Sequence, residues 1–292
     1  MLTRRKTMKY IYLRFPGGKG KALTLSYDDG YIYDLRFAEI INRHGMKCTF
    51  NIFSDIFKTD DPVYLKADQI KSLGDMGHEI AVHGASHIAN GLQTVIGGIS
   101  EAYESRKAIE DTFGIISRGY AYPNSGVNDF IFGMNYEKVR NYLSELGFAY
   151  ARSDERDFDY FLIPEDWYNW CPTAHHDSKR INEYADIFLE ISPNGKRGKD
   201  GMPRLFHIYG HTNEFERKNN WDHIESLCEK LGGREDTWYA TNIEVYDYVQ
   251  DFLRLQFSLD QTRVHNPSAQ PIWLQADKTV CRVDPGKTVS LV

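Results

Sequence analysis

The chain has 292 residues, with 41 acidic and 35 basic side chains, a formal net charge of −6 and a pI near 5.9. No block of lysine and arginine is long enough to form a nucleic-acid or membrane patch, so neither partner is expected. No run of 18 apolar residues and no signal-peptide pattern occurs, which predicts a cytoplasmic protein. The oligomeric state is not indicated by the sequence.

Short apolar runs alternate with amphipathic stretches up to about residue 255. Strands are predicted at 22–27, 48–53, 79–84, 119–122, 148–152, 204–210 and 237–241. Helices are predicted at 34–44, 67–76, 99–113, 135–146, 181–190, 221–231 and 242–255. This rhythm is typical of parallel strands with crossover helices, and seven such units favour a closed or nearly closed α/β barrel.

The pattern changes after residue 255 to short β-type runs and turn signals without a helical period. We therefore expect two units, a barrel at 1–255 and a small β appendage at 256–292. A structural cap is the simplest role for the appendage. The four cysteines, Cys48, Cys171, Cys228 and Cys281, form no C-x-x-C pair, so reduced thiols are expected in place of disulfides or a cysteine-bound zinc.

Polar residues follow several of the predicted strands, where barrels of this class carry their reactive groups. The stretch "HGASH" puts His83 and His87 four residues apart after a strand, a spacing that aims both imidazoles at one point if a helical turn begins there. A carboxylate from another strand end would complete a two-histidine, one-carboxylate metal site, for which zinc is the commonest ion. Two unrelated histidines are the alternative.

The stretch "SYDDG" ends the first strand with Asp28 and Asp29 side by side. Both carboxylates can serve one site only if the chain turns there, as Gly30 permits. A metal on Asp29 would leave Asp28 as the base for a metal-activated water. The pair alone would be read as a solvated turn, and the two histidines make a catalytic centre the better interpretation.

Two further histidines, His207 and His211, lie in "RLFHIYGH". His211 follows the strand, where a general acid is expected, whereas His207 lies within the strand and is typical of a packed core residue. We therefore favour His211 as the acid.

A loop-like stretch at 163–177 combines acidic, aromatic and histidine side chains: Glu165, Asp166, Trp167, Trp170, His175 and His176. An acidic residue there, Asp166, could orient the catalytic histidine, and Trp167 and Trp170 could wall the pocket and stack on a sugar ring. An ordinary surface loop pinned by its aromatic residues is an equal alternative.

Five motifs occur in an order typical of one known family: "TLSYDDG", "HGASH", "YAYPNSG", "EDW" and "LFHIYGH". They resemble the polysaccharide deacetylases, carbohydrate esterase family four, whose shared unit is the NodB-homology domain. The resemblance covers about residues 20–250. It implies a distorted (β/α) barrel that binds a divalent metal, usually zinc, and hydrolyses acetyl groups from sugars.

The resemblance also implies a role for each motif. It makes Asp28 the general base and His211, in preference to His207, the general acid. It implies three metal ligands, Asp29, His83 and His87.

The third motif departs from the family pattern. Pro123 and Asn124 match the residues that line the substrate groove and lend a backbone N–H to the oxyanion. The arginine that usually precedes the proline and holds the base is replaced by Ala121 and Tyr122, and Arg118 is displaced by several residues. The sequence therefore leaves the partner of Asp28 unassigned.

These motifs together predict a metal-dependent hydrolase that removes N- or O-linked acetyl groups from an acetylated sugar or oligosaccharide. One alternative is a related metal-dependent amidohydrolase acting on a non-sugar amide. The other is a non-catalytic sugar-binding module that keeps the barrel and an aromatic groove.

Overall fold

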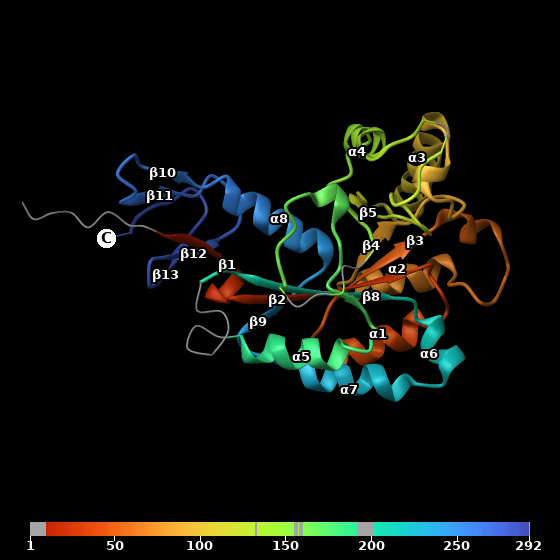
Figure 1. Ribbon diagram of the computed structural model, residues 1–292, viewed down its shortest axis with the longest axis horizontal. Coiled ribbons are helices and arrows are strands. Elements are labelled where there is room, and N and C mark those ends of the chain that lie inside the picture. The colour runs from red at the N-terminus through yellow and green to blue at the C-terminus, as the bar shows by residue number, and fades with distance from the viewer. Residues whose placement is uncertain (1–9, 132, 155–156, 158–159, 192–200, 292) are drawn as a thin grey trace, which may run out of the picture.

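A curved sheet of parallel strands forms the centre of the computed structural model, which describes residues 10–131, 133–154, 157, 160–191 and 201–291 (Figure 1). Residues 1–9 and 192–200 of the predicted barrel unit and residue 292 of the appendage lie outside the described residues. The strands follow the order β6-β5-β4-β3-β2-β8-β7, with β9 also paired to β2. Their bounds are β2 (Lys21–Asp28), β3 (Cys48–Ile52), β4 (Glu79–Val82), β5 (Gly119–Ala121), β6 (Tyr150–Arg152), β7 (Ala174–His175), β8 (Arg204–Gly210) and β9 (Thr237–Tyr239).

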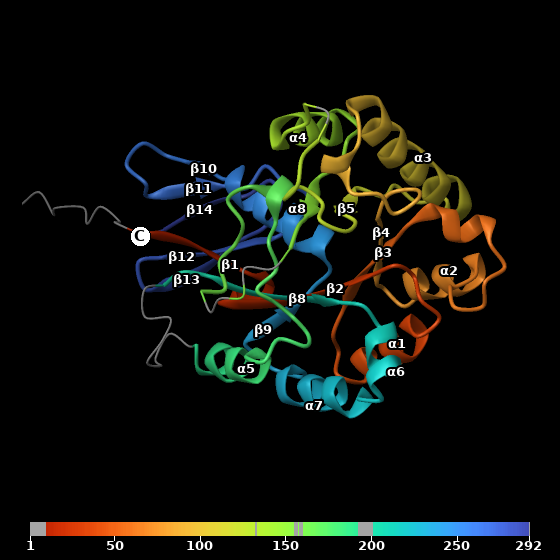
Figure 2. The ribbon, with the colours of Figure 1, turned by 45° about the vertical axis from the view of Figure 1, so that its right-hand side comes forward.

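Helices surround this sheet (Figure 2). They are α1 (Asp34–Arg43), α2 (Ala67–Asp75), α3 (Val95–Phe113), α4 (Tyr136–Glu145), α5 (Ile181–Glu190), α6 (Asn213–Lys218), α7 (Trp221–Leu231) and α8 (Asn242–Leu253). Short 3-10 helices cover Pro16–Gly18, Ser54–Lys58, Asn90–Leu92 and Trp167–Asn169. Among the described residues, no helix has the length and apolar character needed to cross a membrane.

The central strand is β2, and all eight of its residues are buried. It pairs in parallel with β8 along one edge, and with β9 and then β3 along the other. Apolar and polar residues alternate along it, because Leu23, Leu25 and Tyr27 are separated by Thr24 and Ser26. The two buried hydroxyls are satisfied by hydrogen bonds, Thr24 with Asn242 and Ser26 with Asn51. The parallel arrangement also brings the carboxyl ends of the strands to one edge of the sheet, where the polar strand-end residues can meet.

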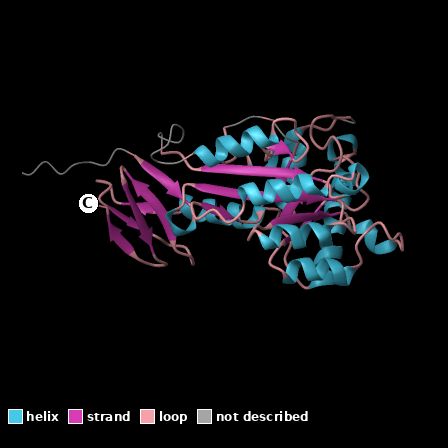
Figure 3. Cartoon of the chain, turned by 90° about the horizontal axis from the view of Figure 1, so that it is seen from below, coloured by secondary structure: helices cyan, strands magenta, loops and turns pink. Residues whose placement is uncertain are grey.

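A second β region, at the end of the molecule near the C-terminus, consists of two small antiparallel sheets (Figure 3). Its strands are β1 (Ile11–Arg14), β10 (Gln256–Phe257), β11 (Arg263–His265), β12 (Ile272–Ala276), β13 (Thr279–Val283) and β14 (Thr288–Ser290). Apolar side chains join it to the barrel: Ile272 and Leu274 of β12 belong to the same buried cluster as Tyr248 of α8. Phe15, which follows β1, belongs to this cluster too.

The structure confirms the predicted fold class, a parallel barrel-like α/β sheet with an antiparallel β appendage. The four cysteines are free thiols, as predicted. The strand at Ile11–Arg14 was not predicted, and it pairs with β12 of the appendage, more than 250 residues along the chain. The boundary at residue 255 stays a prediction.

Helix α3 begins four residues earlier than predicted. Thr94 caps it, because its side-chain oxygen accepts a hydrogen bond from the backbone N–H of Gly97. The first turn contains two glycines and β-branched residues, which have low helix propensity, so the sequence pattern did not predict a helix there.

Glu79 ties several elements together at the amino end of the sheet, away from the polar strand ends. Its carboxylate accepts hydrogen bonds from Thr49 and Tyr150 side chains, both at 2.8 Å, and from the Ile243 N–H at the start of α8, at 2.9 Å. Burial raises the pKa of Glu79 from 4.5 to about 7, even though these hydrogen bonds oppose the shift.

The raised pKa predicts that the protein loses stability as the pH rises from about 4.5 to about 7. Over this range the folded protein holds a proton on Glu79 that the unfolded chain has released, so the free energy of unfolding falls. Glu79→Gln should remove this dependence. The free energy of unfolding of the variant minus that of wild type should therefore increase by about 2 kcal/mol from pH 5 to pH 8. Urea unfolding of both proteins at the two pH values measures this difference, and the same difference at both pH values would contradict the assignment.

Candidate active site

Three side chains that follow β2 and β4 converge on one point. Oδ1 of Asp29 lies 3.5 Å from Nε2 of His83 and 3.2 Å from Nε2 of His87. Ligands placed tetrahedrally about 2.1 Å from a zinc ion lie roughly 3.4 Å from one another. The trio therefore has the spacing of three metal ligands, and Oδ1 of Asp29 is buried with no hydrogen-bond partner among the described residues.

The backbone at this point is held in an uncommon conformation. Asp29 and His87 have positive φ values of 80° and 59°, and Asn124, whose side chain donates a 2.7 Å hydrogen bond to the His87 carbonyl, has 51°. Such conformations cost free energy for residues with a Cβ and cluster at functional sites. The turn after β2 is what allows Asp29 to face the histidines although Asp28 precedes it directly.

His83 is oriented by a hydrogen bond on the far side of its ring. Nδ1 lies 2.9 Å from the carbonyl oxygen of Ala121, and because a carbonyl only accepts, Nδ1 carries the proton. The lone pair on Nε2 then points toward Asp29. Burial lowers the pKa of His83, which keeps the ring neutral and able to bind a cation.

Asp29 is an anion across the physiological range. Burial alone would raise the pKa of its carboxyl, but the neighbouring imidazoles of His87 and His83 outweigh burial and lower the pKa to about 2. Two imidazoles and one carboxylate form a donor set that suits zinc and related divalent ions.

Asp28 is held by residues of two strands, β3 next to β2 and β6 at the edge of the sheet. Oδ1 accepts a 2.8 Å hydrogen bond from the Asn51 amide at the end of β3, and Oδ2 accepts a hydrogen bond from the Arg152 guanidinium at the end of β6. Arg152 is buried, with its guanidinium over the ring of Tyr209. The residue that orients Asp28 is therefore Arg152, whereas Arg118 forms an ion pair with Asp247.

His211 lies on the other side of Asp28 and links the site to a further carboxylate. Its Nε2 lies 3.9 Å from Oδ2 of Asp28 and 4.0 Å from Oδ2 of Asp29, and its Nδ1 lies 3.5 Å from Oε1 of Glu214 in α6. Burial lowers the pKa of His211, but Glu214 and the two aspartates outweigh burial and raise the pKa above its usual value. This environment favours the protonated ring, as a general acid requires.

One family model matches the first half of the chain. Residues 16–151 match the model described as polysaccharide deacetylase. This region is therefore similar to polysaccharide deacetylases. The match includes Asp28, Asp29 and the two histidines but ends one residue before Arg152, and it does not reach His211. The comparison with curated proteins found no match.

Solved structures share the fold of this chain at low sequence identity. A putative polysaccharide deacetylase from Mycobacterium smegmatis aligns with 83% of this chain and 95% of its own, with a TM-score of 0.55 and 14% identity. Puue allantoinase aligns with 80% of this chain and 91% of its own, with a TM-score of 0.56 and 12% identity. The chain spans about half, 54%, of the Streptococcus pyogenes deacetylase PplD in complex with acetate, over 44% of its own length, with a TM-score of 0.40 and 16% identity. The first two likenesses establish the fold of this chain.

Two residues of the predicted pocket lie elsewhere in the structure. Trp170 is 1% exposed and packs against Trp167, Tyr150 and His207, so it is a core residue and cannot stack on a sugar. Asp166 caps the 3-10 helix that follows it by accepting from the Tyr168 N–H, and it also accepts from the Tyr136 hydroxyl. Glu214, not Asp166, faces His211.

The remaining predicted residues are placed as follows. Pro123 packs beside Gly84, next to the histidine motif. Trp167 is half-buried against Trp170 and Tyr246, and no contact joins it to Asp28 or His211 among those described. His207 is buried in the middle of β8, and neither ring nitrogen has a hydrogen-bond partner in the described part of the chain. Burial and the charge of Arg152 lower its pKa well below the usual value, so it is a neutral core histidine.

A stacked aromatic pair beside Asp29 was not predicted. The rings of Tyr31 and Tyr64 stack with centroids 5.5 Å apart, and Phe53 joins Tyr64 to His87 through edge-on contacts. Burial and the charge of Asp29 raise the pKa of Tyr31, so its hydroxyl stays protonated as a donor. These rings lie beside Asp29 and His87, whereas the described ring contacts of Trp167 and Trp170 reach neither residue.

Proposed function

We propose that this protein is a divalent-metal-dependent deacetylase that removes acetyl groups from an acetylated sugar or oligosaccharide. The proposal rests on one observation: the Asp29, His83 and His87 trio lies beside an Arg152-bound Asp28 and a histidine with a raised pKa. The polysaccharide deacetylase match supports acetyl hydrolysis as the reaction class.

The trio fits a divalent cation because it offers two imidazoles and one carboxylate at the expected spacing. When bound there, such an ion lowers the pKa of water from about 15.7 to roughly 7 and polarises the acetyl carbonyl. Three protein ligands also leave coordination positions open, as catalytic zinc sites do.

Asp28 is proposed as the general base. Its carboxylate lies next to the trio but is not part of it, so it can take the proton of the attacking water. Asn51 and Arg152 fix its orientation from opposite oxygens.

His211 is proposed as the general acid. Its Nε2 faces the aspartates and its Nδ1 faces Glu214, so the proton to be donated lies on the substrate side. As the acetyl carbon–nitrogen or carbon–oxygen bond breaks, Nε2 gives its proton to the leaving amine or alcohol. A backbone N–H near Asn124 is the proposed donor to the oxyanion.

The test compares acetate release from N-acetylated and O-acetylated mono- and oligosaccharides with hydrolysis of non-sugar amides, allantoin among them. Puue allantoinase shares this fold, so a non-sugar amide is the alternative substrate class. Acetate release from a sugar substrate supports the proposal. Hydrolysis confined to the non-sugar amides overturns the substrate class, and sugar binding without any hydrolysis favours a non-catalytic module.

A matched pair of variants tests the acid. His211→Gln should lower kcat by roughly a hundredfold, because a glutamine amide cannot protonate the leaving group as an imidazolium does. His207→Gln should leave kcat within a few fold, since that ring is buried behind the site. Steady-state rates of both variants decide between them, and the reverse order of effects would show that His207 is the acid.

A further inference from the structure

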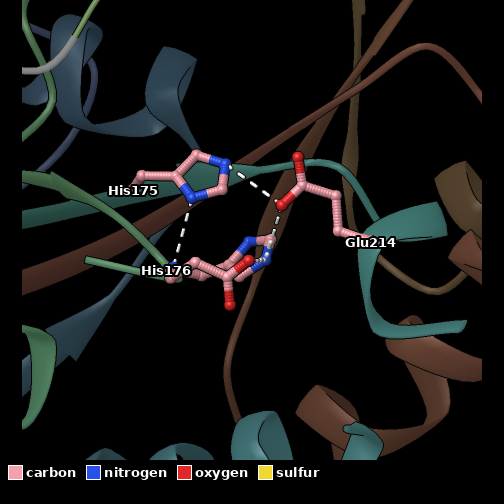
Figure 4. A group of neighbouring side chains, drawn as sticks. His175, His176 and Glu214 are labelled. Carbon is pink, nitrogen blue, oxygen red and sulfur yellow. Dashed lines mark hydrogen bonds and ion pairs between the residues drawn. The ribbon is translucent and has the colours of Figure 1, made fainter. Parts of the chain in front are cut away.

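A second group of imidazoles and carboxylates lies against the other ring nitrogen of His211. His175, His176 and Asp177 stand at and just after the end of β7, and Glu214 reaches them from α6 (Figure 4). Oε1 of Glu214 faces His211, and its Oε2 faces this group. Glu214 joins the group to the proposed general acid, and the other three residues have none of the roles proposed above.

The spacing within the group resembles that of the trio at Asp29. Nε2 of His176 lies 3.4 Å from Oδ2 of Asp177 and 3.4 Å from Oε2 of Glu214. Both values equal the roughly 3.4 Å expected between ligands of one tetrahedral zinc ion. One imidazole and two carboxylates also carry the charge that a divalent cation balances.

His176 supplies an independent sign that a ligand belongs here. The side chain is fully buried, and neither ring nitrogen has a hydrogen-bond partner among the described residues. Tyr27 and Phe215 stack on its ring, and Gly210 leaves room for Nδ1, because a Cβ there would lie 1.9 Å from it. The packing therefore fixes the ring with Nε2 aimed at both carboxylates, and a cation would satisfy that nitrogen.

His175 has a different role, although Figure 4 shows its ring beside Glu214. Its Nδ1 accepts a 3.2 Å hydrogen bond from the Asp177 N–H, so its proton lies on Nε2, which faces Oε2 of Glu214 at 3.6 Å. A protonated nitrogen cannot bind a metal. His175 is thus a donor that positions Glu214.

Lys218 competes for the same carboxylates. Its ammonium group contacts Asp177 and lies 3.4 Å from Oε2 of Glu214, and the side chain is 41% exposed. A flexible, partly exposed lysine can leave the carboxylates when a divalent ion, which attracts them more strongly, arrives. We propose that His176, Asp177 and Glu214 form a second divalent-cation site that Lys218 closes when the ion is absent.

The test counts bound Zn²⁺ on the full chain by equilibrium dialysis and metal analysis. Wild type should bind two equivalents, His87→Ala one, and Asp177→Asn one, while the double variant should bind none. Asp186→Asn is the matched control, because Asp186 pairs with a lysine, Lys230, outside the group. Lys218→Met should tighten the equivalent that survives in His87→Ala by about fivefold or more.

The results separate this site from the catalytic one. Loss of one equivalent of Zn²⁺ on Asp177→Asn substitution, in wild type and in His87→Ala alike, supports the second site even if no deacetylase activity is found. If Asp177→Asn binds as much Zn²⁺ as wild type, Lys218 is the cation of the group and the proposal is overturned. If Lys218→Met leaves the affinity for Zn²⁺ at the second site unchanged, the proposal that Lys218 competes with the ion is overturned.

Discussion

Replacement of Asp28 with asparagine should lower kcat for acetate release by roughly a thousandfold. The amide keeps the size of the carboxylate and can still accept from Arg152, but it cannot take a proton from water. Because Asp28 is not one of the three proposed ligands, the variant should keep the metal content of wild type. Steady-state kinetics and metal analysis on the same preparation measure both quantities.

Asp34→Asn provides the matched control for this experiment. Asp34 is also buried near the site and accepts a 2.7 Å hydrogen bond from Thr212, but burial raises the pKa of its carboxyl well above the usual value. An asparagine there keeps the size of the side chain and can still accept from Thr212, and Asp34 has none of the proposed catalytic roles, so activity should stay within a few fold. Near-normal acetate release by Asp28→Asn would show that another group is the base.

Replacement of His87 with alanine should remove the cation bound by the trio and lower kcat by roughly a thousandfold or more. The side chain is 29% exposed, so its loss leaves no closed cavity in the core and the fold should survive. Asp29 and His83 alone offer two ligands, too few for a stable zinc site. Metal analysis and kinetics of the purified variant test this expectation.

His265→Ala in the β appendage is the control for that variant. His265 is a partly exposed histidine that contacts Thr288, and it should affect neither metal content nor rate. A full complement of metal in His87→Ala, with normal activity, would mean that the proposed ligand set is wrong.

Much of the fold could be predicted because local signals agreed with the tertiary structure. The helices at Ile181–Glu190 and Trp221–Leu231 begin and end where their apolar periodicity does. Strand β7 was missed because two residues, Ala174 and His175, are too few to show a period, and α6 was missed for a similar reason. Strand β1 gains its partner, β12, only through a contact across nearly the whole chain.

Site residues that lie in short sequence motifs could be predicted, whereas contacts between distant strands and helices could not. Asp28, Asp29, His83 and His87 stand out because each follows a strand within a short motif. Arg152 also ends a predicted strand, and that position was an available signal.

Asn51 and Glu214 could not be identified from the sequence. Nothing in their local patterns says that β3 lies beside β2 or that α6 turns back toward His211. Trp170 misled the prediction because a tryptophan in a loop-like stretch looks exposed, whereas here it fills the space beside Tyr150 and His207.

Acetate release by metal-stripped protein, measured before and after Zn²⁺ is returned, is the most direct test of a metal-dependent deacetylase. We expect no acetate from an acetylated oligosaccharide before the metal is returned and recovery of the full rate afterwards in wild type, but no recovery in His87→Ala. Acetate release that is unchanged by metal removal, or that the metal restores equally in His87→Ala, would contradict the proposed centre at Asp29, His83 and His87.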